Sequence, residues 1–468
     1  MLPMKICLLN DSFPPVIDGV ANVVRNYAEY LTRDHGALVA VGTPRYPDAD
    51  YGAYPYQVVP YQSFDTSALL SGYRTGNPFS AKYVSELAAF APDIIHTHCP
   101  AASTMLARLL REQTGAPVIF TYHTKYDVDI ERVLKVKLAA KEAIRTMVSA
   151  VGACDEVWVV SRGAGENLKA LGYEGDVRVM QNGVDFAKGR VDAKAVEQAT
   201  AGYDLPAGVP VYLFVGRLMT YKGLPLILDA LKLLREKGRD FRMVFIGKGP
   251  DRELLERQAT ENGLSDRCIF TGPIYDRNVL RAWNTRADLF LFPSTFDTNG
   301  LVVREAAACG LAGVLIRDSC AAEGITDGRN GFLIEETPAS MAALLERVGG
   351  DLPLLHAVGQ RAMDEIYVSW SSSVAAAYSR YAEVLELKRA GMLPEKRRQP
   401  ADLFYSLAAK SIEEQERRRQ IWTALQESFR ESAVGMMENI QEAGESAESF
   451  RHKLAEQLRQ EIDELRKR

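Results

Sequence analysis

Short apolar runs alternate with longer amphipathic stretches through the first part of the chain. Most of these runs are continuously apolar and rich in β-branched and aromatic residues, which is typical of parallel strands covered on both faces. Amphipathic stretches over 20–33, 101–113 and 131–151 predict helices between them. This alternation predicts βαβ units in a doubly wound sheet. The predicted strands are 5–10, 37–43, 92–98, 117–123, 155–161 and 177–183.

The same alternation restarts after a polar segment, 187–209, which shows no strong pattern and which we interpret as a linker. Strands are predicted over 211–216, 241–247, 268–272, 288–294, 312–316 and 331–335, with helices over 224–238, 251–262, 276–286 and from about 300. The chain is therefore predicted to be an α/β protein with two Rossmann-like domains. Two such sheets face each other across a cleft at the carboxyl ends of their strands, where ligands of these folds bind.

The last hundred residues have a different character. A predicted helix over 366–388 leads to a glycine- and proline-containing break, after which 401–468 contains no proline and a dense, nearly balanced set of charges. This pattern predicts long exposed helices. Two interpretations remain open, a surface for a homo-oligomer through 401–468 or a solvated appendage. The predicted units are 1–186, 205–365, 366–388 and 389–468.

Composition narrows the class of protein. A length of 468 residues suggests two domains, and 47% hydrophobic with 25% charged residues is ordinary for a globular protein. The net charge of −5 gives no reason to expect a nucleic-acid partner. Neither a membrane-spanning run nor a signal peptide is evident, and the six cysteines lack zinc-binding spacing. We expect a cytoplasmic protein with free thiols.

Three glycine-containing loops follow predicted strands and precede predicted helices. They are Asp18-Gly19, the GKGP segment that begins at Gly247, and the Thr-Asn-Gly segment that contains Asn299 and Gly300. Glycine at such a place lets the backbone approach a phosphate, where free N–H groups and the helix dipole favour negative charge. One such loop is usually only a turn, but three at the same cleft predict a phosphate-bearing ligand.

Two cations lie in a fourth loop of the same kind. Arg217 and Lys222 follow the strand 211–216 within the segment GRLMTYKG. A guanidinium binds phosphate through two hydrogen bonds, and lysine adds a mobile point charge. Such a pair would stabilise a leaving diphosphate as it gains negative charge.

Taken together, VGRLMTYKG, FIGKGP and PSTFDTNGLVVREAAACG resemble family 4 glycosyltransferases of the GT-B type. The resemblance covers about 1–388 and implies a retaining transferase that uses a nucleotide sugar. It also implies that 366–388 returns to the N-terminal domain. The TFDTNGLVVREA variant is similar to transferases that glycosylate diacylglycerol, so UDP-glucose and a membrane-lipid or glycolipid acceptor are favoured.

The resemblance also implies roles for individual residues. Glu305 would bind the ribose hydroxyls, and Asp297, one methylene shorter than the usual glutamate, would face the transferred sugar. Backbone N–H groups at Asn299, Gly300 and Leu301 would hold sugar or phosphate oxygens. In the same comparison Arg217 and Lys222 match the diphosphate-binding pair and take the place of a metal ion, so that no cofactor is expected.

Two further parts of the site follow from the same comparison. Gly19 matches the N-terminal phosphate loop, and 273–275, which includes Ile274, matches the segment that holds the base through its backbone. His123 matches a histidine near the sugar and is predicted to be catalytic together with Asp297, Arg217 and Lys222. His96 and His98 are interpreted as structural residues or as lining of the acceptor site, without a metal.

A basic amphipathic helix is predicted over about 128–151, with Arg132, Lys135, Lys137, Lys141 and Arg145 among apolar residues. Such a helix can lie on an anionic membrane, which would place the protein on the inner face of that membrane, although a solvated basic face over an ordinary core helix is the simpler interpretation.

Other functions also remain open. The acceptor could be a soluble compound or a polysaccharide, with a GDP- or UDP-sugar as donor. In a different class, the chain could be a non-catalytic subunit that acts through its C-terminal helices.

Overall fold

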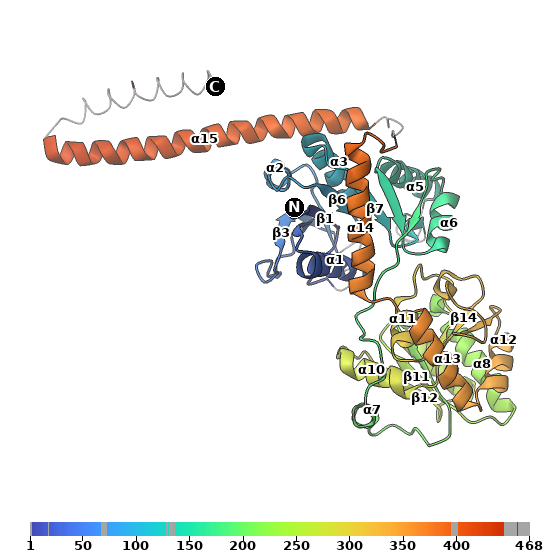
Figure 1. Cartoon of the computed structure of the whole chain (residues 1–468). Coiled ribbons are helices and arrows are strands. Elements are labelled where there is room, and N and C mark those ends of the chain that lie inside the picture. The colour runs from blue at the N-terminus through green and yellow to red at the C-terminus, as the bar shows by residue number, and fades with distance from the viewer. Residues whose placement is uncertain are drawn as a thin grey trace.

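Two open parallel sheets with helices on both faces form the body of the protein (Figure 1). The computed structural model describes residues 2–16, 18–66, 73–127, 130, 134, 136–394, 401–443 and 456. Every strand pair in the two large sheets is parallel, which confirms the predicted α/β class. The sheets belong to successive parts of the chain, so they form an N-terminal and a C-terminal domain.

The N-terminal sheet has the strand order β3-β2-β1-β6-β7-β8-β9. Its elements are β1 (Lys5–Leu9), α1 (Gly19–His35), β2 (Leu38–Pro44), β3 (Gln57–Tyr61), α2 (Ala81–Ala89), β6 (Ile94–Thr97), α3 (Ala102–Thr114), β7 (Val118–Tyr122), α5 (Lys137–Gly152), β8 (Glu156–Val159), α6 (Arg162–Ala170) and β9 (Arg178–Val179). A small antiparallel hairpin, β4 (Ser63–Asp65) and β5 (Arg74–Gly76), follows β3. The strand β3, the hairpin and α2 were not predicted from the sequence. β3 was missed because it contains Pro60, and a proline argues against a central strand. Proline is tolerated here because β3 lies at the edge of the sheet.

The C-terminal sheet has the order β12-β11-β10-β13-β14-β15. Its elements are β10 (Val211–Val215), η1 (Thr220–Lys222), α8 (Leu224–Glu236), β11 (Arg242–Ile246), α9 (Arg252–Glu261), β12 (Cys268–Gly272), α10 (Arg277–Arg286), β13 (Leu289–Phe292), α11 (Leu301–Ala308), β14 (Gly313–Ile316), η2 (Cys320–Ala322), β15 (Phe332–Ile334), α12 (Pro338–Val348) and α13 (Leu352–Glu365). The interpretation of 187–209 as a patternless linker is wrong in part, because α7 (Ala193–Thr200) lies within it and packs on α10. None of its residues is buried in the structure.

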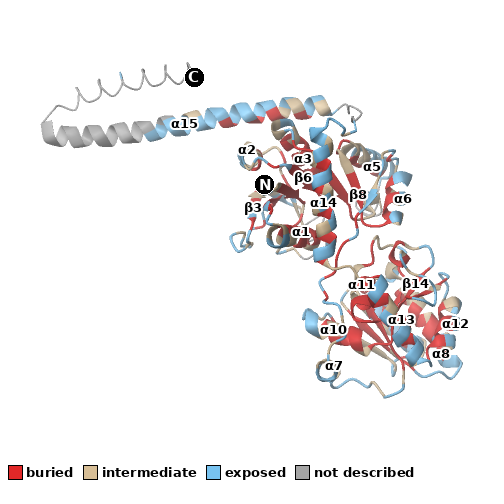
Figure 2. Ribbon diagram, in the orientation of Figure 1, coloured by how far each residue is buried: buried red, intermediate tan, exposed pale blue. Residues whose placement is uncertain are grey.

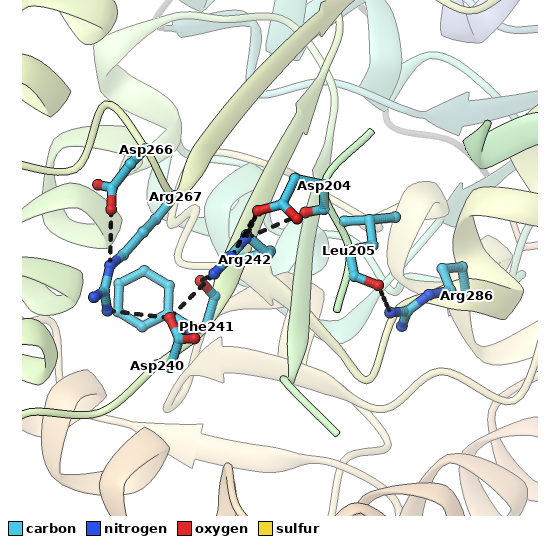
Figure 3. Close-up of polar contacts among 8 residues, drawn as sticks. All are labelled: Asp204, Leu205, Asp240, Phe241, Arg242, Asp266, Arg267 and Arg286. Atoms are coloured by element: carbon cyan, nitrogen blue, oxygen red, sulfur yellow. Dashed lines mark hydrogen bonds and ion pairs between the residues drawn. The ribbon is translucent and has the colours of Figure 1, made fainter. Parts of the chain in front are cut away.

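Charged residues at the amino ends of the C-terminal strands form an ion-pair network (Figure 3). Arg242, the first residue of β11, contacts Asp204 and Asp240, and Arg267 contacts Asp240 and Asp266. Ligands of such sheets bind at the carboxyl ends of the strands, so this network lies at the opposite end of the sheet from the expected ligand site.

The helix α14 (Trp370–Arg389) returns to the N-terminal domain and packs against α1. Trp370 and Tyr381 are buried in the core between α1 and the sheet, and the Tyr381 ring stacks on Trp158 at 5.4 Å between ring centroids. The two chain crossings between the domains run side by side, because the Val184 N–H donates to the Val368 carbonyl at 3.0 Å.

The long helix α15 (Asp402–Ala443) starts on the N-terminal domain and then extends away from it (Figures 1 and 2). Tyr405, Ala409 and Ile412 are buried against α2 and α3. Arg108 of α3 donates to Asp402 at 2.6 Å, and its guanidinium carbon lies 3.9 Å from the Tyr405 ring centroid. The interpretation of this region as a solvated appendage is therefore wrong for its first turns, which complete a domain core. Residues 395–400, 444–455 and 457–468 lie outside the described residues.

Candidate functional site

The loops at the carboxyl ends of β10 and β11 are packed against each other. Gly247 has a φ of +150°, and a Cβ atom at that position would lie 1.9 Å from the Gly216 carbonyl oxygen. The Leu218 N–H donates to the Lys248 carbonyl at 3.0 Å. Only glycine allows this close approach, so the GKGP glycine positions the loop that carries Arg217 and Lys222.

Arg217 and Lys222 have different surroundings. The Arg217 side chain is exposed, and no hydrogen bond or ion pair to it is found among the described residues. Lys222 is largely buried, and its Nζ lies 2.5 Å from Oδ1 of Asp297. The structure thus pairs a residue predicted to bind the diphosphate with one predicted to face the sugar.

The Asp297 carboxylate is held on both sides. Its second oxygen accepts a hydrogen bond from the Ser294 hydroxyl at 2.6 Å, and Ser294 is fully buried. Charge-assisted hydrogen bonds of this kind are short and strong. Ser294 was missed by the sequence analysis, although it lies in the PSTFD segment that identified Asp297.

The next residues form an uncapped helix N-terminus. Gly300 has a φ of +57° and precedes α11, which has no side-chain cap. Asn299 is buried, its Oδ1 accepts from Arg304 Nε at 3.2 Å, and its Nδ2 has no hydrogen-bond partner in the described part of the chain. A buried donor without a partner is costly, so a ligand oxygen here would satisfy it. Gly300 and Leu301 supply the first backbone N–H groups beside it.

Glu305 lies one turn further into α11 and is mostly buried. Burial raises the pKa of its carboxyl group, and the guanidinium of Arg277 opposes that shift. Arg277 Nη2 lies 2.6 Å from Glu305 Oε1. Arg277 was also missed by the sequence analysis.

In the N-terminal domain, Asp18 caps α1 and accepts a hydrogen bond from the Ala21 N–H at 2.7 Å. Gly19 is exposed, and a Cβ atom there would meet no atom within 4 Å. Tyr73 donates to the other oxygen of Asp18 at 3.3 Å. Burial raises the pKa of Tyr73, as does the neighbouring Asp18, and the positive charge of Arg217 opposes that shift.

His123 is buried beside a second histidine. Its Nε2 lies 2.9 Å from Nδ1 of His98, and burial lowers the pKa of His123 to about 3. His96 contacts Tyr381 at 2.6 Å and Thr121 at 2.7 Å through its two ring nitrogens. Both ring nitrogens of His96 therefore have partners, and the residue is fully buried.

Direct contacts join the two domains at this point. The Thr298 hydroxyl donates to the His123 carbonyl at 2.5 Å, and Lys125 Nζ donates to the Thr295 carbonyl at 3.1 Å. Glu323 accepts hydrogen bonds from the Arg162 and Gly163 N–H groups, at the N-terminus of α6. The loop that carries Asp297 is therefore fastened to the strand end that carries His123.

The predicted base segment and the predicted basic helix lie outside these contacts. Ile274 is half-buried against the C-terminal core, and its neighbours 273 and 275 are exposed. The described helix α5 begins at Lys137 and exposes Lys137, Lys141 and Arg145. Arg132 and Lys135 lie outside the described residues. No helix in the described ranges has both the length and the apolar character needed to cross a membrane.

Comparison with family models gives two matches. Residues 17–188 match the model described as Glycosyltransferase Family 4, and residues 197–364 match the model described as Glycosyl transferases group 1. The first match ends after β9, and the second begins within α7, in the segment that joins the two sheets.

Similar proteins and structures agree with these matches. Sulfoquinovosyl transferase SQD2 of Arabidopsis thaliana is 28% identical over 78% of this chain and 70% of its own length. Alpha-monoglucosyldiacylglycerol synthase of Streptococcus pneumoniae is 25% identical over 66% and 70%. The structure of Anabaena HepE in complex with UDP has a TM-score of 0.63 at 20% identity and covers 82% of this chain and 100% of that chain. The last comparison supports the two-domain GT-B fold.

Proposed function

We propose, from the premise that this chain belongs to the family 4 glycosyltransferases and is a hexosyltransferase, that it transfers glucose from UDP-glucose to a membrane-lipid or glycolipid acceptor with retention of the anomeric configuration. The observation that carries the proposal is the convergence of Lys222, Asp297, Asn299 and Glu305 beside the uncapped start of α11.

In this proposal the C-terminal domain binds the donor. Arg217 and Lys222 bind the diphosphate, the Asn299 amide and the N–H groups of Gly300 and Leu301 bind phosphate or sugar oxygens, and Glu305 binds the ribose. Hydrogen-bond donors and cations that are already in place stabilise the charge that develops on the leaving group. In this proposal, these groups stabilise the leaving group without a metal ion.

The proposed chemistry is a displacement on one face of the sugar. The bond between the anomeric carbon and the β-phosphate oxygen breaks, and the acceptor oxygen forms its bond to the same face. The acceptor proton passes to the departing phosphate oxygen. In this proposal Asp297 orients the sugar, and His123, neutral because of its low pKa, belongs to the domain that we assign to the acceptor. The protein contributes mainly position and charge.

Two observations favour a lipid acceptor. The names of two similar proteins include a diacylglycerol, namely the alpha-monoglucosyldiacylglycerol synthases of Streptococcus pneumoniae and Acholeplasma laidlawii. In this chain, exposed Lys137, Lys141 and Arg145 lie beside Leu138, whose exposure is 71%. A basic helix with exposed apolar residues can bind an anionic membrane surface, which would give access to a lipid.

Thermal unfolding with nucleotides tests the donor site. UDP and UDP-glucose should raise the melting temperature in the presence of EDTA, because a ligand that binds only the folded state stabilises it. GDP and GDP-mannose should have a smaller effect, and added magnesium should change neither result. If none of these four compounds shifts the melting temperature, the donor assignment is wrong and a non-catalytic role becomes the better hypothesis.

An assay with radiolabelled UDP-glucose tests the acceptor. Vesicles that contain diacylglycerol or its monoglucosyl derivative should accept label, whereas soluble sugars should not, and NMR of the product should show an α-linkage. Replacement of Lys137, Lys141 and Arg145 by glutamate should reduce vesicle binding and leave UDP binding unchanged. Transfer to soluble acceptors alone would contradict the lipid proposal.

A further inference from the structure

Arg277, the first residue of α10, connects the predicted ribose site with the first chain crossing between the domains. Its guanidinium lies 2.6 Å from Glu305 and 3.8 Å from Asp185, and it covers the ring of Phe186 at 4.4 Å from the ring centroid. Phe186 is itself buried. The cation is thus held by the crossing segment on one side and by a buried carboxylate on the other.

The position of Arg277 matters because Glu305 is poorly solvated. A buried carboxylate is favoured in its charged form only when a cation or several hydrogen-bond donors compensate for the lost water. Arg277 is the cation that opposes this cost, whereas the nearby Asp185 favours the neutral form. Cys309, at the end of the same helix, also faces Glu305.

The geometry leaves one oxygen of Glu305 available. Oε1 accepts from Arg277, and no hydrogen bond to Oε2 is found within the ranges that the structure describes. An ionised carboxylate offers only acceptors, which suit two neighbouring sugar hydroxyls. A protonated carboxyl group would have to donate one of its hydrogen bonds and would fit these hydroxyls less well.

We infer that Arg277 is a positioning residue of the donor site, which holds the Glu305 carboxylate ionised and oriented so that its free oxygen accepts hydrogen bonds from the ribose of the nucleotide. The inference rests on the proposed donor site. It adds a residue that contacts no part of the donor and acts only through Glu305.

The alternative is that Arg277 merely fastens α10 to the crossing segment. Arg281, one turn further along α10, provides a matched control, because it donates to the Ala187 and Gly189 carbonyls of that same segment at 3.1 Å and forms no ion pair with Glu305. If fastening alone mattered, replacement of either arginine would affect all nucleotides equally.

The experiment measures binding of UDP and of 2′,3′-dideoxy-UDP by calorimetry to the full-length wild type and to Arg277→Gln, Arg277→Lys, Arg281→Gln and Glu305→Gln. The wild type should bind UDP at least tenfold more tightly than the dideoxy compound. Arg277→Gln should lose most of this preference, as should Glu305→Gln, and a further variant that combines Arg277→Gln with Glu305→Gln should lose no more. Arg277→Lys should restore part of it, and Arg281→Gln should keep it.

A pH series adds a readout that a fastening role would not change. In Arg277→Gln, UDP affinity should fall more steeply than in the wild type between pH 8 and pH 6, because Glu305 becomes easier to protonate, while dideoxy-UDP binding should follow the wild type. Steady-state kinetics should show about a tenfold higher KM for UDP-glucose with kcat within about threefold, since the lost interaction is uniform binding.

The failure of this inference differs from failure of the proposed function. If the wild type binds UDP and Arg277→Gln keeps the preference for the ribose hydroxyls, or loses affinity for both nucleotides equally, the inference is wrong and the donor site stands. If the wild type binds neither UDP nor GDP, the proposed function is wrong and the inference falls with it. If GDP is bound instead, GDP and its dideoxy derivative replace the uridine pair with the same criteria.

Discussion

The Nζ atom of Lys222 lies 2.5 Å from Oδ1 of Asp297, in a place where both side chains are largely shielded from water. The two residues come from different loops, after β10 and after β13. Their pairing means that the cation assigned to the diphosphate and the acid assigned to the sugar form one unit before the donor binds. The shorter aspartate reaches both Lys222 and Ser294, which fixes its carboxylate at the base of the site.

This pairing predicts unequal effects on stability. Asp297→Ala should reduce the free energy of unfolding by about 3 kcal/mol, because it leaves the Lys222 cation buried without its partner. The double variant Lys222→Met/Asp297→Ala should lose less than the sum of the single losses, as shown by urea denaturation. Additive losses would mean that the ion pair does not form in solution.

Arg217 should behave in the opposite way. Because its side chain is exposed, Arg217→Ala should change the free energy of unfolding by less than about 0.5 kcal/mol. If it binds the diphosphate, kcat/KM for UDP-glucose should fall at least about a hundredfold, measured by initial rates. Near-normal turnover would contradict the diphosphate assignment.

The buried histidines predict a dependence of stability on pH. Burial lowers the pKa of His123 to about 3, whereas a histidine in the unfolded chain titrates near 6.5. The unfolded chain therefore binds more protons, so this contribution is fully present above about pH 6.5 and is lost as the pH falls toward 3. His123→Asn should reduce the slope of the unfolding free energy against pH by up to about 1.4 kcal/mol per pH unit. Urea titrations at pH 7, 6 and 5 would measure it, and equal slopes would refute it.

Two truncations should separate the docked part of α15 from the rest. Ending the chain at residue 400 removes Tyr405, Ala409 and Ile412 and exposes the apolar surface beneath them, so stability should fall by roughly 3 kcal/mol or more. Ending it at residue 427 should leave stability close to that of the full chain. UDP binding should be the same in both, because the contacts lie on α2 and α3. Light scattering of the two forms would test the predicted oligomer, and equal stabilities would contradict the docking.

The contact between the two glycine loops also gives a direct test. Gly247→Ala should abolish UDP binding or lower the melting temperature sharply, since the new Cβ would overlap the Gly216 carbonyl. Gly350→Ala is the control, because a Cβ there meets no atom within 4 Å. A Gly247→Ala protein with normal binding would show that the loops can separate.

The parts of the fold that could be predicted are those with continuous apolar strands and amphipathic helices. The two parallel sheets were predicted because strands such as 211–215 are buried on both faces and hence apolar throughout. Two of the missed elements differ from these. Edge strand β3 contains a proline, and α7 buries none of its residues. The docking of α15 could not be predicted because Tyr405, Ala409 and Ile412 lie among other apolar residues, such as Leu403 and Leu407, that stay exposed.

Site residues that directly follow a strand could be predicted from the sequence. Contacts between residues far apart in the chain could not be predicted. Lys222 and Glu305 could be singled out from their motifs, although their roles remain predictions. Their partnership with Asp297 and Arg277 could not, because the pairs are 75 and 28 residues apart in the chain. Only the parallel arrangement of β10, β12 and β13 brings these loops to one edge.

Helices from the C-terminal part of the chain pack on the sheet of the N-terminal domain. Trp370 and Tyr381 of α14, and then the first turns of α15, fill surfaces on opposite faces of a sheet whose strands are complete by residue 179. During synthesis on the ribosome, that sheet must wait for more than two hundred further residues before both faces are closed. The C-terminal domain is translated and can fold in the interval, so the order of synthesis makes the N-terminal half the part that depends most on protection from aggregation.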